Sequence, residues 1–347
     1  MEIVKIENKQ IGINQPCFVI AEIGTNHNCS LDTAKELIDV AADSGVDAVK
    51  FQTYRPTDIV HPEIPANAYG HFRESNEKYW YEVLENYVLP EEWYPELWDY
   101  ANKKGLIAIS TASSPYCVDF LLELNIPAFK VASMDINYFP LLEKLAQTKK
   151  PIILSTGMSH ISEIDEAIRF LRKKGCSQLI VTYCVSNYPA KPEQLNIKQI
   201  PILEQIFDLP AGFSDHSLGI NTSIAAVVLG AKVIEKHITL NRNMKGPDHS
   251  FSLEPNELKK LVSGIREVEL AIKQKNDIEF YDLGKRAEFR RSIVTKVKIK
   301  KGEVITNDKI QFTRPGNGIE PIELNKILGR KVNKDIPQNT VLRWEYF

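Results

Sequence analysis

The stretch GFSDH, residues Gly212–His216, and the related stretch IEKHIT, residues Ile234–Thr239, indicate how this chain folds. Each places a histidine just after a short apolar run, and one helix-length segment lies between them. Two such runs joined by a helix are typical of neighbouring parallel strands. Parallel strands end at one edge of a sheet, where α/β proteins carry out their chemistry, so we expect His216 and His237 to emerge there side by side.

The same unit recurs along the chain as a β-rich run, a polar or glycine-containing turn and an amphipathic helix. The first helix has its apolar residues on one face, begins after Ser30 and ends at Gly45, which are typical cap residues. Counting from Cys17, the candidate strands are residues 18–21, 47–52, 106–110, 128–132, 151–155, 179–183, 209–213 and 231–234.

Eight β-α units within about 250 residues are typical of a TIM barrel, (β/α)8. A doubly wound open sheet is the alternative, because a sequence does not show whether the sheet closes. We assign residues 1–272 to the barrel, with an N-terminal hairpin at 1–14, and the polar residues 273–286 to a linker. The apolar period then changes to two, with a strand predicted around Lys296–Lys300 and another near Val304, so residues 287–347 form a small β-rich C-terminal domain.

One connection is long, since roughly forty residues separate the second strand from its helix. It carries aromatic residues that include Tyr69, Phe72, Tyr79 and Trp80. Long loops after barrel strands lie on the catalytic face, so this loop forms a wall or lid of the site, or else a surface excursion packed by its own aromatic side chains.

The composition excludes several classes of protein. Lys and Arg number 43 against 45 Asp and Glu, so no global field attracts nucleic acid or an anionic membrane. A hydrophobic content of 43% and a mean hydropathy of −0.24 fit a globular protein, and the N-terminal residues show neither a signal peptide nor a membrane span. Five cysteines without a C-x-x-C pair predict free thiols and a cytoplasmic location.

A polar residue stands at the C-terminal end of every predicted strand, and in a barrel these ends converge on one pocket. Lys50 and Lys130, together with Ser and Thr hydroxyl groups, make a site for a compact phosphate or carboxylate. The alternative for each lysine is a solvated charge or a structural ion pair. The candidates in chain order are Glu22, Lys50, Gln52, Ser110, Thr111, Lys130, Ser133, Asp135, Ser155, Ser186, Tyr188, Ser214, Asp215, His216, Glu235, Lys236 and His237.

His216 and His237 on adjacent strands can bind a divalent metal, with Asp215 or Glu235 completing or orienting the site. Such a metal would polarise a carbonyl group. Two imidazoles do not identify the ion, and ligand softness alone favours Zn or Fe over Mg or Mn. The alternative is two histidines satisfied by hydrogen bonds.

Taken together, the motifs resemble those of the sialic acid synthase family over almost the whole chain. They are AEIGTNHN, VKFQ, FKVAS, LSTGM, Tyr188-Pro189, GFSDH, EKHIT, GPDHSFSLEP and RPGNGI, and they occur in the order that the family shows. From Arg290 onward the chain resembles the antifreeze-like (SAF) domain of those enzymes.

The resemblance implies a metal-dependent condensation of phosphoenolpyruvate with an open-chain N-acetylated amino sugar, N-acetylmannosamine or a close analogue. The products are a nine-carbon 3-deoxy-2-keto acid and inorganic phosphate. It implies that Mn²⁺ or Mg²⁺ is held by His216 and His237 and that Glu22 lies nearest the reacting carbons. The implied ligands of phosphoenolpyruvate are Lys50, Thr111, Lys130, Ser133, Ser155 and Ser214, and those of the sugar are Gln52, Tyr188, Glu235, Asp248 and, from the other subunit of a swapped homodimer, Arg314.

This sequence departs from the family pattern at three positions. Ala112 stands where many relatives have Pro, Asp135 where some have Glu, and Ser186 where some have Asn. Asp135 and Ser186 remain substrate-site candidates, and the departures affect the fit to the sugar more than the phosphoenolpyruvate site. The motifs fit a legionaminate or pseudaminate synthase as well as an N-acetylneuraminate synthase. Two other functions are a Schiff-base aldolase that uses Lys130 and a non-catalytic sugar-binding protein.

Overall fold

The computed structural model describes residues 3–68, 77–272 and 283–347. The chain divides into two compact units, residues 1–273 and 274–347. Each unit has an apolar core of its own, because the buried apolar residues of the C-terminal unit form a separate cluster around Ile293, Ile299 and Ile336. The two units therefore fold around independent cores.

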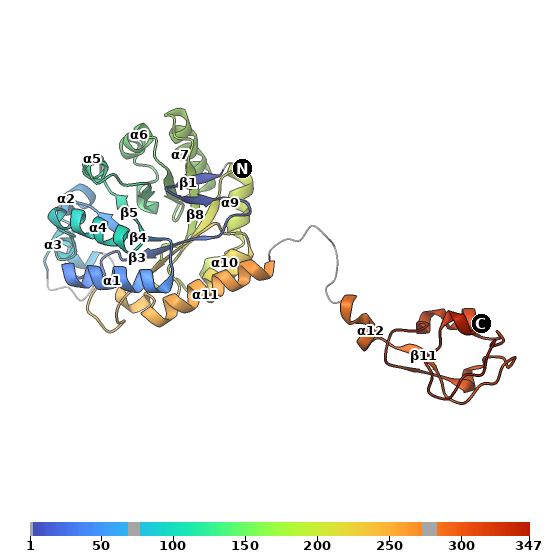
Figure 1. Cartoon of the computed structure of the whole chain (residues 1–347). Coiled ribbons are helices and arrows are strands. Elements are labelled where there is room, and N and C mark those ends of the chain that lie inside the picture. The colour runs from blue at the N-terminus through green and yellow to red at the C-terminus, as the bar shows by residue number, and fades with distance from the viewer. Residues whose placement is uncertain (1–2, 69–76, 273–282) are drawn as a thin grey trace. The chain divides into compact units, whose positions relative to one another are not determined.

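The larger unit is a TIM barrel, as predicted, and not an open sheet. Eight parallel strands close in the order β10-β3-β4-β5-β6-β7-β8-β9 (Figure 1). The strands are β3 (Phe18–Glu22), β4 (Ala48–Thr53), β5 (Ile107–Ala112), β6 (Phe129–Val131), β7 (Ile152–Ser155), β8 (Leu179–Cys184), β9 (Ala211–Asp215) and β10 (Val233–His237). The last two continue beyond the predicted ends at residues 213 and 234, so His237 is itself the last residue of a strand.

The longer helices of the larger unit surround these strands (Figure 1). They are α1 (Leu31–Ser44), α4 (Tyr94–Lys103), α5 (Pro115–Glu123), α6 (Phe139–Gln147), α7 (Ile161–Lys173), α9 (Gln199–Phe207), α10 (Asn221–Val228) and α11 (Pro255–Ile272). The predicted caps of α1 are confirmed: the Ser30 side chain accepts a hydrogen bond from the Thr33 amide, and Gly45 is left-handed with φ of 76°. Glycine adopts that conformation without the strain that a side chain would add.

The interior of the barrel changes from apolar to polar along its axis. Inward-facing residues at the N-terminal ends of the strands are apolar, and the hairpin of β1 (Val4–Ile6) and β2 (Lys9–Ile11) adds its buried side chains to them. This cluster comprises Val4, Ile6, Ile11, Phe18, Ile20, Ala48, Ile107, Ile109, Ala128, Ile153, Ile180 and Val233. The hairpin therefore closes the N-terminal end and leaves the C-terminal end for polar side chains.

The long connection after β4 contains α2 (Pro56–Ile59), η1 (Ala66–Ala68), α3 (Trp80–Glu85) and η3 (Glu91–Trp93). Tyr54, Trp80 and Leu84 form part of a small apolar cluster of its own. The described part of this connection therefore fits the prediction of a surface loop that is packed by its own apolar side chains. Tyr69 and Phe72, on which the alternative of a lid partly rested, lie outside the described residues.

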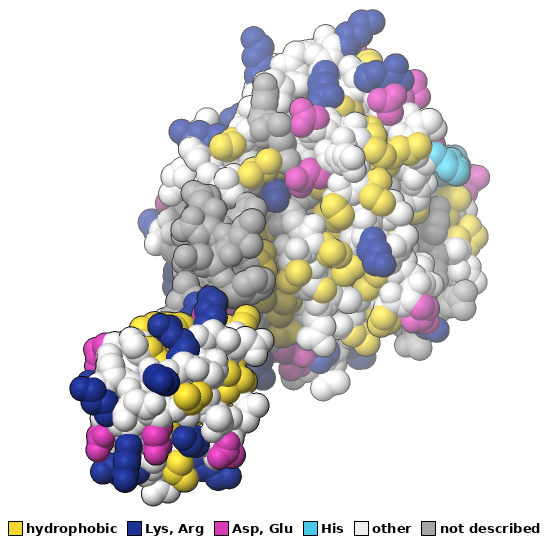
Figure 2. Space-filling model, turned by 90° about the vertical axis from the view of Figure 1, so that its right-hand side faces the viewer, with side chains coloured by type: hydrophobic (Ala, Val, Ile, Leu, Met, Phe, Trp, Pro, Cys, Tyr) yellow, Lys and Arg dark blue, Asp and Glu magenta, His cyan; other side chains and the backbone are white. Residues whose placement is uncertain are grey.

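The smaller unit contains one antiparallel pair, β11 (Ser292–Thr295) and β12 (Ile310–Thr313), with short helices α12 (Arg286–Phe289) and α13 (Leu324–Ile327). The strand predicted around Lys296–Lys300 is wrong, because only Ile299 makes a single bridge there and Val297 is 42% exposed. Alternating Lys and apolar residues did not mark a buried face. Lysines and arginines are prominent on the visible face of this unit (Figure 2).

The remaining short helices are α8 (Pro192–Leu195), η4 (Ser133–Asp135), η5 (His249–Phe251), η6 (Leu283–Lys285), η7 (Asn307–Lys309), η8 (Pro321–Glu323) and η9 (Trp344–Tyr346). None of the helices in the described ranges has the length and apolar character needed to cross a membrane. All five cysteines are free thiols, as predicted.

Candidate active site

The alternation of side chains along β10 sets the pattern of the site. Glu235 and His237 face into the barrel, while Lys236 between them faces the surrounding helices. The same period operates on β4, where Lys50 and Gln52 share the inner face. Polar groups from separate strands therefore meet at the C-terminal end of the barrel.

Two lysines and two glutamates form a buried chain of charges across this end. The Lys50 ammonium lies 2.8 Å from Glu22 Oε2 and 3.9 Å from Glu235 Oε1, and Lys130 Nζ donates to Glu235 Oε1 at 3.1 Å. All four residues are no more than 4% exposed. Buried charges are costly unless they are paired, so this arrangement keeps both cations in place.

Neutral donors and acceptors surround the chain of charges. Lys50 Nζ donates to Thr111 Oγ1 at 3.0 Å, and Gln52 Nε2 donates to Glu22 Oε1 at 2.7 Å. Ser214 Oγ donates to Glu235 Oε1 at 2.8 Å. In contrast, Glu235 Oε2 is buried and has no hydrogen-bond partner among the described residues. That oxygen is available to a ligand.

Burial and neighbouring charges give the two glutamates of this cluster very different pKa values. Burial, with a contribution from the Glu235 charge, raises the pKa of Glu22 to about 7 although Lys50 opposes the shift. Burial alone would raise the pKa of Glu235, but Lys130 and Lys50 outweigh it and hold that pKa far below its usual range. Burial would likewise lower the pKa of Lys50, but Glu22 and Glu235 outweigh it and raise that pKa. Glu22 is therefore the group suited to exchange a proton near neutral pH.

His216 and His237 lie side by side, as predicted, with ring centroids 5.6 Å apart. Tyr188 packs on His216 with a centroid distance of 4.2 Å, and Phe251 packs on His237 at 5.1 Å. Burial lowers the pKa of His216 to about 4, and burial together with His216 and Lys50 lowers that of His237 well below its usual range. Both rings are neutral at pH 7.

The two rings fit a divalent cation. His216 Nδ1 lies 2.9 Å from the Val185 carbonyl, a contact that favours a proton on Nδ1 and a free lone pair on Nε2. His237 Nδ1 is buried without a hydrogen-bond partner and lies 3.5 Å from Asp248 Oδ2. No group of three or more His, Cys, Asp or Glu side chains arranged for a metal occurs in the part of the chain that the structure describes. Protein ligands would therefore be supplemented by substrate or water oxygens.

Asp248 joins the two parts of the site. Its Oδ2 accepts a hydrogen bond from Thr25 Oγ1 at 3.1 Å, and burial raises its pKa to about 6. Gly24 lies between the groups, since a Cβ there would stand 3.3 Å from Asp248 Oδ2, from Gln52 Nε2 and from Glu22 Oε1. A side chain there would make tight contacts with all three atoms, and Gly24 also has a φ of 53°, a conformation that glycine adopts without strain.

The predicted hydroxyl groups on the other side of the barrel also gather. Ser133 Oγ accepts from the Gly157 amide at 2.9 Å, and a Cβ on Gly157 would stand 2.6 Å from Ser186 Oγ and 2.8 Å from Ser133 Oγ. Ser155 Oγ lies 2.9 Å from Thr182 Oγ1 on the adjacent strand. Small residues thus leave room for hydroxyl and amide groups that suit an anion.

One predicted residue of the barrel is not joined to this cluster. The Asp135 carboxylate makes no hydrogen bond or ion pair with another described residue, and burial raises its pKa to about 6. Arg314 belongs to the smaller unit, where its guanidinium lies 5.4 Å from the centroid of the Phe289 ring.

The Asp215 carboxylate lies outside the cavity, so it cannot complete the metal site as a ligand. Asp215 faces outward and accepts hydrogen bonds from Ser217, Thr222 and Ser223 at 2.6–2.9 Å, and Lys236 Nζ lies 3.0 Å from it. Lys236 and Ser110 face outward as well, the latter bonded to Thr53. Adjacent residues on a strand face opposite sides, so these three cannot share the cavity with their inward-facing neighbours.

The sequence interpretation missed Thr182 and Thr25. Thr182 faces inward beside Ser155, and its signal was the alternation of Ile180, Thr182 and Cys184 in the run LIVTYC. Thr25 follows β3 in a loop, where no period indicates which side chain turns toward Asp248.

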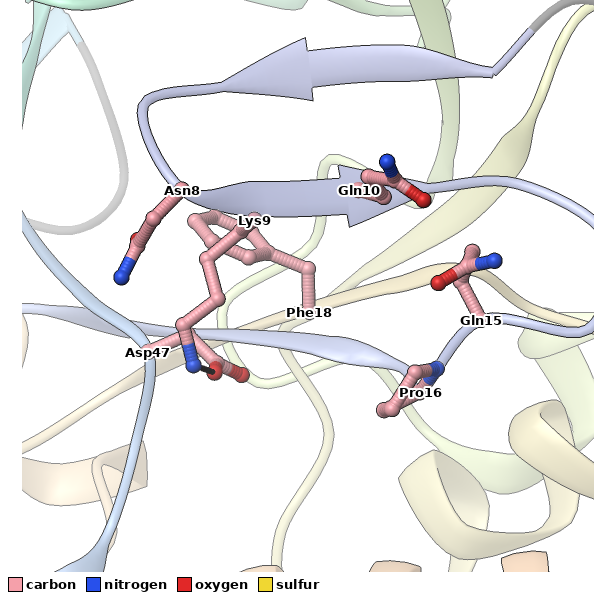
Figure 3. A pocket seen from close by; sticks show the side chains of 7 residues that line it. All are labelled: Asn8, Lys9, Gln10, Gln15, Pro16, Phe18 and Asp47. Carbon is pink, nitrogen blue, oxygen red and sulfur yellow. Dashed lines mark hydrogen bonds and ion pairs between the residues drawn. The ribbon is translucent and has the colours of Figure 1, made fainter.

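A surface pocket between the hairpin and the barrel lies at the opposite, N-terminal end. Lys9 there points toward Asp47, and the two side chains form an ion pair of 2.6 Å (Figure 3). It contains none of the predicted site residues, so the candidate active site is the cluster at the C-terminal end.

The NeuB family model matches residues 37–277 and the SAF domain model matches residues 290–347. The chain is 37% identical to N,N'-diacetyllegionaminic acid synthase of Legionella pneumophila, covering 97% of this chain and 96% of that one. It is 34% identical to N-acetylneuraminate-9-phosphate synthase of Homo sapiens, covering 99% and 96%. The structure of N-acetylneuraminic acid (sialic acid) synthetase from Leptospira borgpetersenii in complex with citrate is similar with a TM-score of 0.72 and 32% identity, covering 82% and 94%.

Proposed function

The chain belongs to the NeuB family of phosphoenolpyruvate-dependent condensing enzymes, and we propose that it joins phosphoenolpyruvate to an open-chain N-acetylated amino sugar. The products are a nine-carbon 3-deoxy-2-keto acid and inorganic phosphate. The observation that supports this most is the buried placement of Lys50 and Lys130, with Glu22 and Glu235, at the barrel end that also holds the His216–His237 pair.

Phosphoenolpyruvate would be bound by the two ammonium groups and the surrounding hydroxyls. Lys50 and Lys130 supply positive charge, and burial strengthens their attraction for a phosphate or carboxylate. The hydroxyl groups are those of Thr111, Ser133, Ser155 and Ser214. Ser186 lies next to Ser133 around Gly157 and extends this set. These groups hold the substrate in a fixed orientation, which converts a bimolecular encounter into an oriented reaction.

The sugar would lie over the histidines. Gln52, Tyr188, Glu235 and Asp248 border that space, and Asp135 on η4 is a further candidate. His216 and His237 would hold Mn²⁺ or Mg²⁺, which, when bound, polarises the aldehyde of the sugar. Neutral imidazoles are what a metal requires, and the lowered pKa values of both rings keep them neutral.

The residues then account for the reaction. The methylene carbon of phosphoenolpyruvate would bond to the aldehyde carbon with the electron pair of its C=C bond, and the aldehyde oxygen would take up a proton from solvent. Positive charge develops at the carbon that carries the phosphate ester, where the Glu22 and Glu235 carboxylates stabilise it. Water adds to that carbon and gives up a proton, for which Glu22 is the nearest candidate base. The carbon–oxygen bond to phosphate breaks, inorganic phosphate leaves and the keto group forms.

The geometry favours this chemistry over a Schiff-base aldolase. Lys130 Nζ donates a hydrogen bond to Glu235 Oε1 at 3.1 Å, so the nitrogen is engaged by a carboxylate and is not free to attack a carbonyl group. Failure of borohydride to trap pyruvate on Lys130 is the expected result. Trapping would favour the aldolase.

A coupled phosphate assay tests the function. Release of phosphate from phosphoenolpyruvate should require both a divalent cation and an N-acetylated amino sugar. A panel of free and 6-phosphorylated sugars, including N-acetylmannosamine and the precursors of legionaminic and pseudaminic acids, identifies the acceptor. Release without sugar would contradict the proposal, and sugar binding without turnover that survives His216→Ala and His237→Ala would indicate a binding protein.

We further propose that the protein is cytoplasmic, because its free thiols suit a reducing compartment. We also propose that it forms a homodimer in which Arg314 completes the site of the other subunit. Mixing inactive Arg314→Ala subunits with inactive His237→Ala subunits should restore activity, since a hybrid dimer contains one intact site. Absence of rescue, despite demonstrated subunit exchange, would show that Arg314 acts within its own chain. Removing residues 284–347 should leave a folded barrel with little activity.

A further inference from the structure

An ion pair lies on the outer side of the barrel next to the two histidines. Asp215 precedes His216 on the chain and Lys236 precedes His237, and the register of β9 and β10 pairs Asp215 with Lys236. Lys236 Nζ lies 3.0 Å from Asp215 Oδ2, and both residues are 1% exposed. The pair therefore links the ends of the two strands that carry the imidazoles.

The Asp215 carboxylate is satisfied on every side. Its Oδ1 accepts from the Ser217 amide at 2.8 Å and from Ser217 Oγ at 2.7 Å. Its Oδ2 accepts from Thr222 Oγ1 at 2.9 Å and from Ser223 Oγ at 2.6 Å, both in the first turn of α10. The carboxylate thus joins the end of β9, the loop that follows it and the start of α10.

Lys236 closes the connection from the other strand. Besides Asp215, its ammonium group donates to the Ser217 carbonyl, so one cation binds the residues on both sides of His216. The backbone of His216 is also held by the Ala190 amide, which donates to its carbonyl at 3.0 Å. The histidine ring has little freedom to move away from its neighbour.

We propose that Asp215 and Lys236 are positioning residues that fix the spacing of His216 and His237 for the divalent cation. The pair contacts neither substrate nor metal, because it lies on the opposite side of the strands from the imidazoles. This inference rests on the metal-binding part of the proposed function. Groups that hydrogen-bond directly to metal ligands orient them, and their loss weakens metal binding by about 10-fold to 100-fold. Asp215 and Lys236 act one step further away, through the residues on both sides of His216, so we expect an effect near the lower end of that range.

The test measures binding of Mn²⁺ to the metal-free full-length chain by the EPR signal of free Mn²⁺. Lys236→Met, Asp215→Asn and the double variant should each raise the Kd for Mn²⁺ by about 10-fold or more. The double variant leaves no unpaired buried charge, so its Tm should recover relative to the single variants while its Kd stays high. A purely structural role would restore both quantities together.

A matched control separates positioning from general destabilisation. Asp47→Asn removes a buried carboxylate at the opposite end of the barrel, and we expect it to lower Tm and leave the Kd for Mn²⁺ unchanged. Ser223→Ala deletes one hydroxyl donor to Asp215 and keeps the ion pair, so it provides a milder variant if the charge variants do not fold. We expect it to raise the Kd by about threefold.

The outcomes are distinct. Folded variants that bind Mn²⁺ as tightly as the parent would overturn the inference and leave the proposed function intact. A parent chain that releases phosphate from both substrates but does not bind Mn²⁺ would overturn the metal step and this inference with it. A KM for phosphoenolpyruvate that stays within about twofold in the variants, while the Mn²⁺ concentration for half-maximal rate rises, supports the inference.

Discussion

The two ends of the barrel both bury charged side chains, but they complete the hydrogen bonds of those side chains differently. At the C-terminal end, Glu235 Oε2 and His237 Nδ1 are buried without hydrogen-bond partners among the described residues. At the N-terminal end, Asp47 Oδ2 accepts from the Val19 amide at 2.9 Å and from Arg266 at 3.0 Å, and its Oδ1 accepts from Lys9.

The N-terminal network also includes the backbone. Arg266 Nη1 donates to the Cys17 carbonyl at 2.9 Å and lies 3.0 Å from Glu269 Oε2. These charged side chains connect α11 to β3 and to the hairpin of β1 and β2. Such pairs stabilise the fold, because every polar atom they bury has a partner.

The difference shows how a scaffold and a site can be distinguished without a ligand. An unpaired buried polar atom costs about 1 to 3 kcal/mol, and a ligand that supplies the missing partner removes that cost. Charged clusters that are complete in themselves, such as Asp47 with Arg266 or Asp215 with Lys236, support the structure. The incomplete cluster around Glu235 and His237 is the one that substrates would complete.

Removing a site cation should give the largest effect. Lys130→Met should lower kcat/KM for phosphoenolpyruvate by roughly 10³-fold, because a preorganised charge at the phosphate or carboxylate is lost. Lys9→Met at the other end is the matched control and should leave kcat/KM unchanged in a steady-state phosphate assay. A loss of less than tenfold in the Lys130 variant would erase the contrast between the two ends.

Replacing Glu22 should have the next largest effect on rate. Glu22→Gln should lower kcat/KM by about 10²-fold or more, since a positioned acid or base contributes on that scale. With a pKa of about 7, the ionised form that pairs with Lys50 increases as the pH rises, so kcat/KM of the parent should rise through pH 7. The pH–rate profile of the variant should lose this inflection. A parent profile that is flat between pH 6 and 8 would contradict the assignment.

A substitution at the N-terminal end of the barrel should change the stability of the protein and not its catalytic rate. Asp47→Ala should lower the free energy of unfolding by about 3 kcal/mol, because Arg266 and the Val19 amide lose their buried acceptor. Urea unfolding monitored by circular dichroism measures the change. The folded variant should keep the kcat/KM of the parent, and a large loss of rate in a stable variant would show that this end contributes to the chemistry.

The pH dependence of stability should show the smallest effect and should belong to the C-terminal end. Burial lowers the pKa of both His27 and His249 to about 4, so between about pH 4 and 6.5 the unfolded chain binds more protons than the folded chain. The free energy of unfolding should therefore fall as the pH is lowered from 6.5 to 4, by on the order of 1 to 3 kcal/mol for each histidine.

His249→Gln should flatten this dependence, whereas Asp47→Asn should keep it. The raised pKa of Glu22 acts with the opposite sign between about pH 4.5 and 7, so the informative quantity is the difference between variant and parent. Urea unfolding at several pH values gives that difference. Equal slopes in the His249 variant and the parent would refute the assignment.

Much of the fold could be predicted because its signals are local. Ser30 and Gly45 marked the ends of α1, and repeated apolar runs marked eight strands, since caps and periods depend on near neighbours along the chain. In the C-terminal unit the alternation at Lys296–Lys300 does not correspond to a strand. These residues form an irregular segment with a single bridge at Ile299. The neighbouring residues in the sequence do not distinguish such a segment from a regular strand.

By itself the sequence determined the eight β-α units, the presence of polar residues at the strand ends and the neighbouring placement of His216 and His237. Only the tertiary structure decided that Glu235 faces the cavity while Asp215 and Lys236 face the helices. The physical reason is that a period of two is visible in one strand, whereas its phase relative to the barrel axis is set by hydrogen-bonded register with strands far away in the chain.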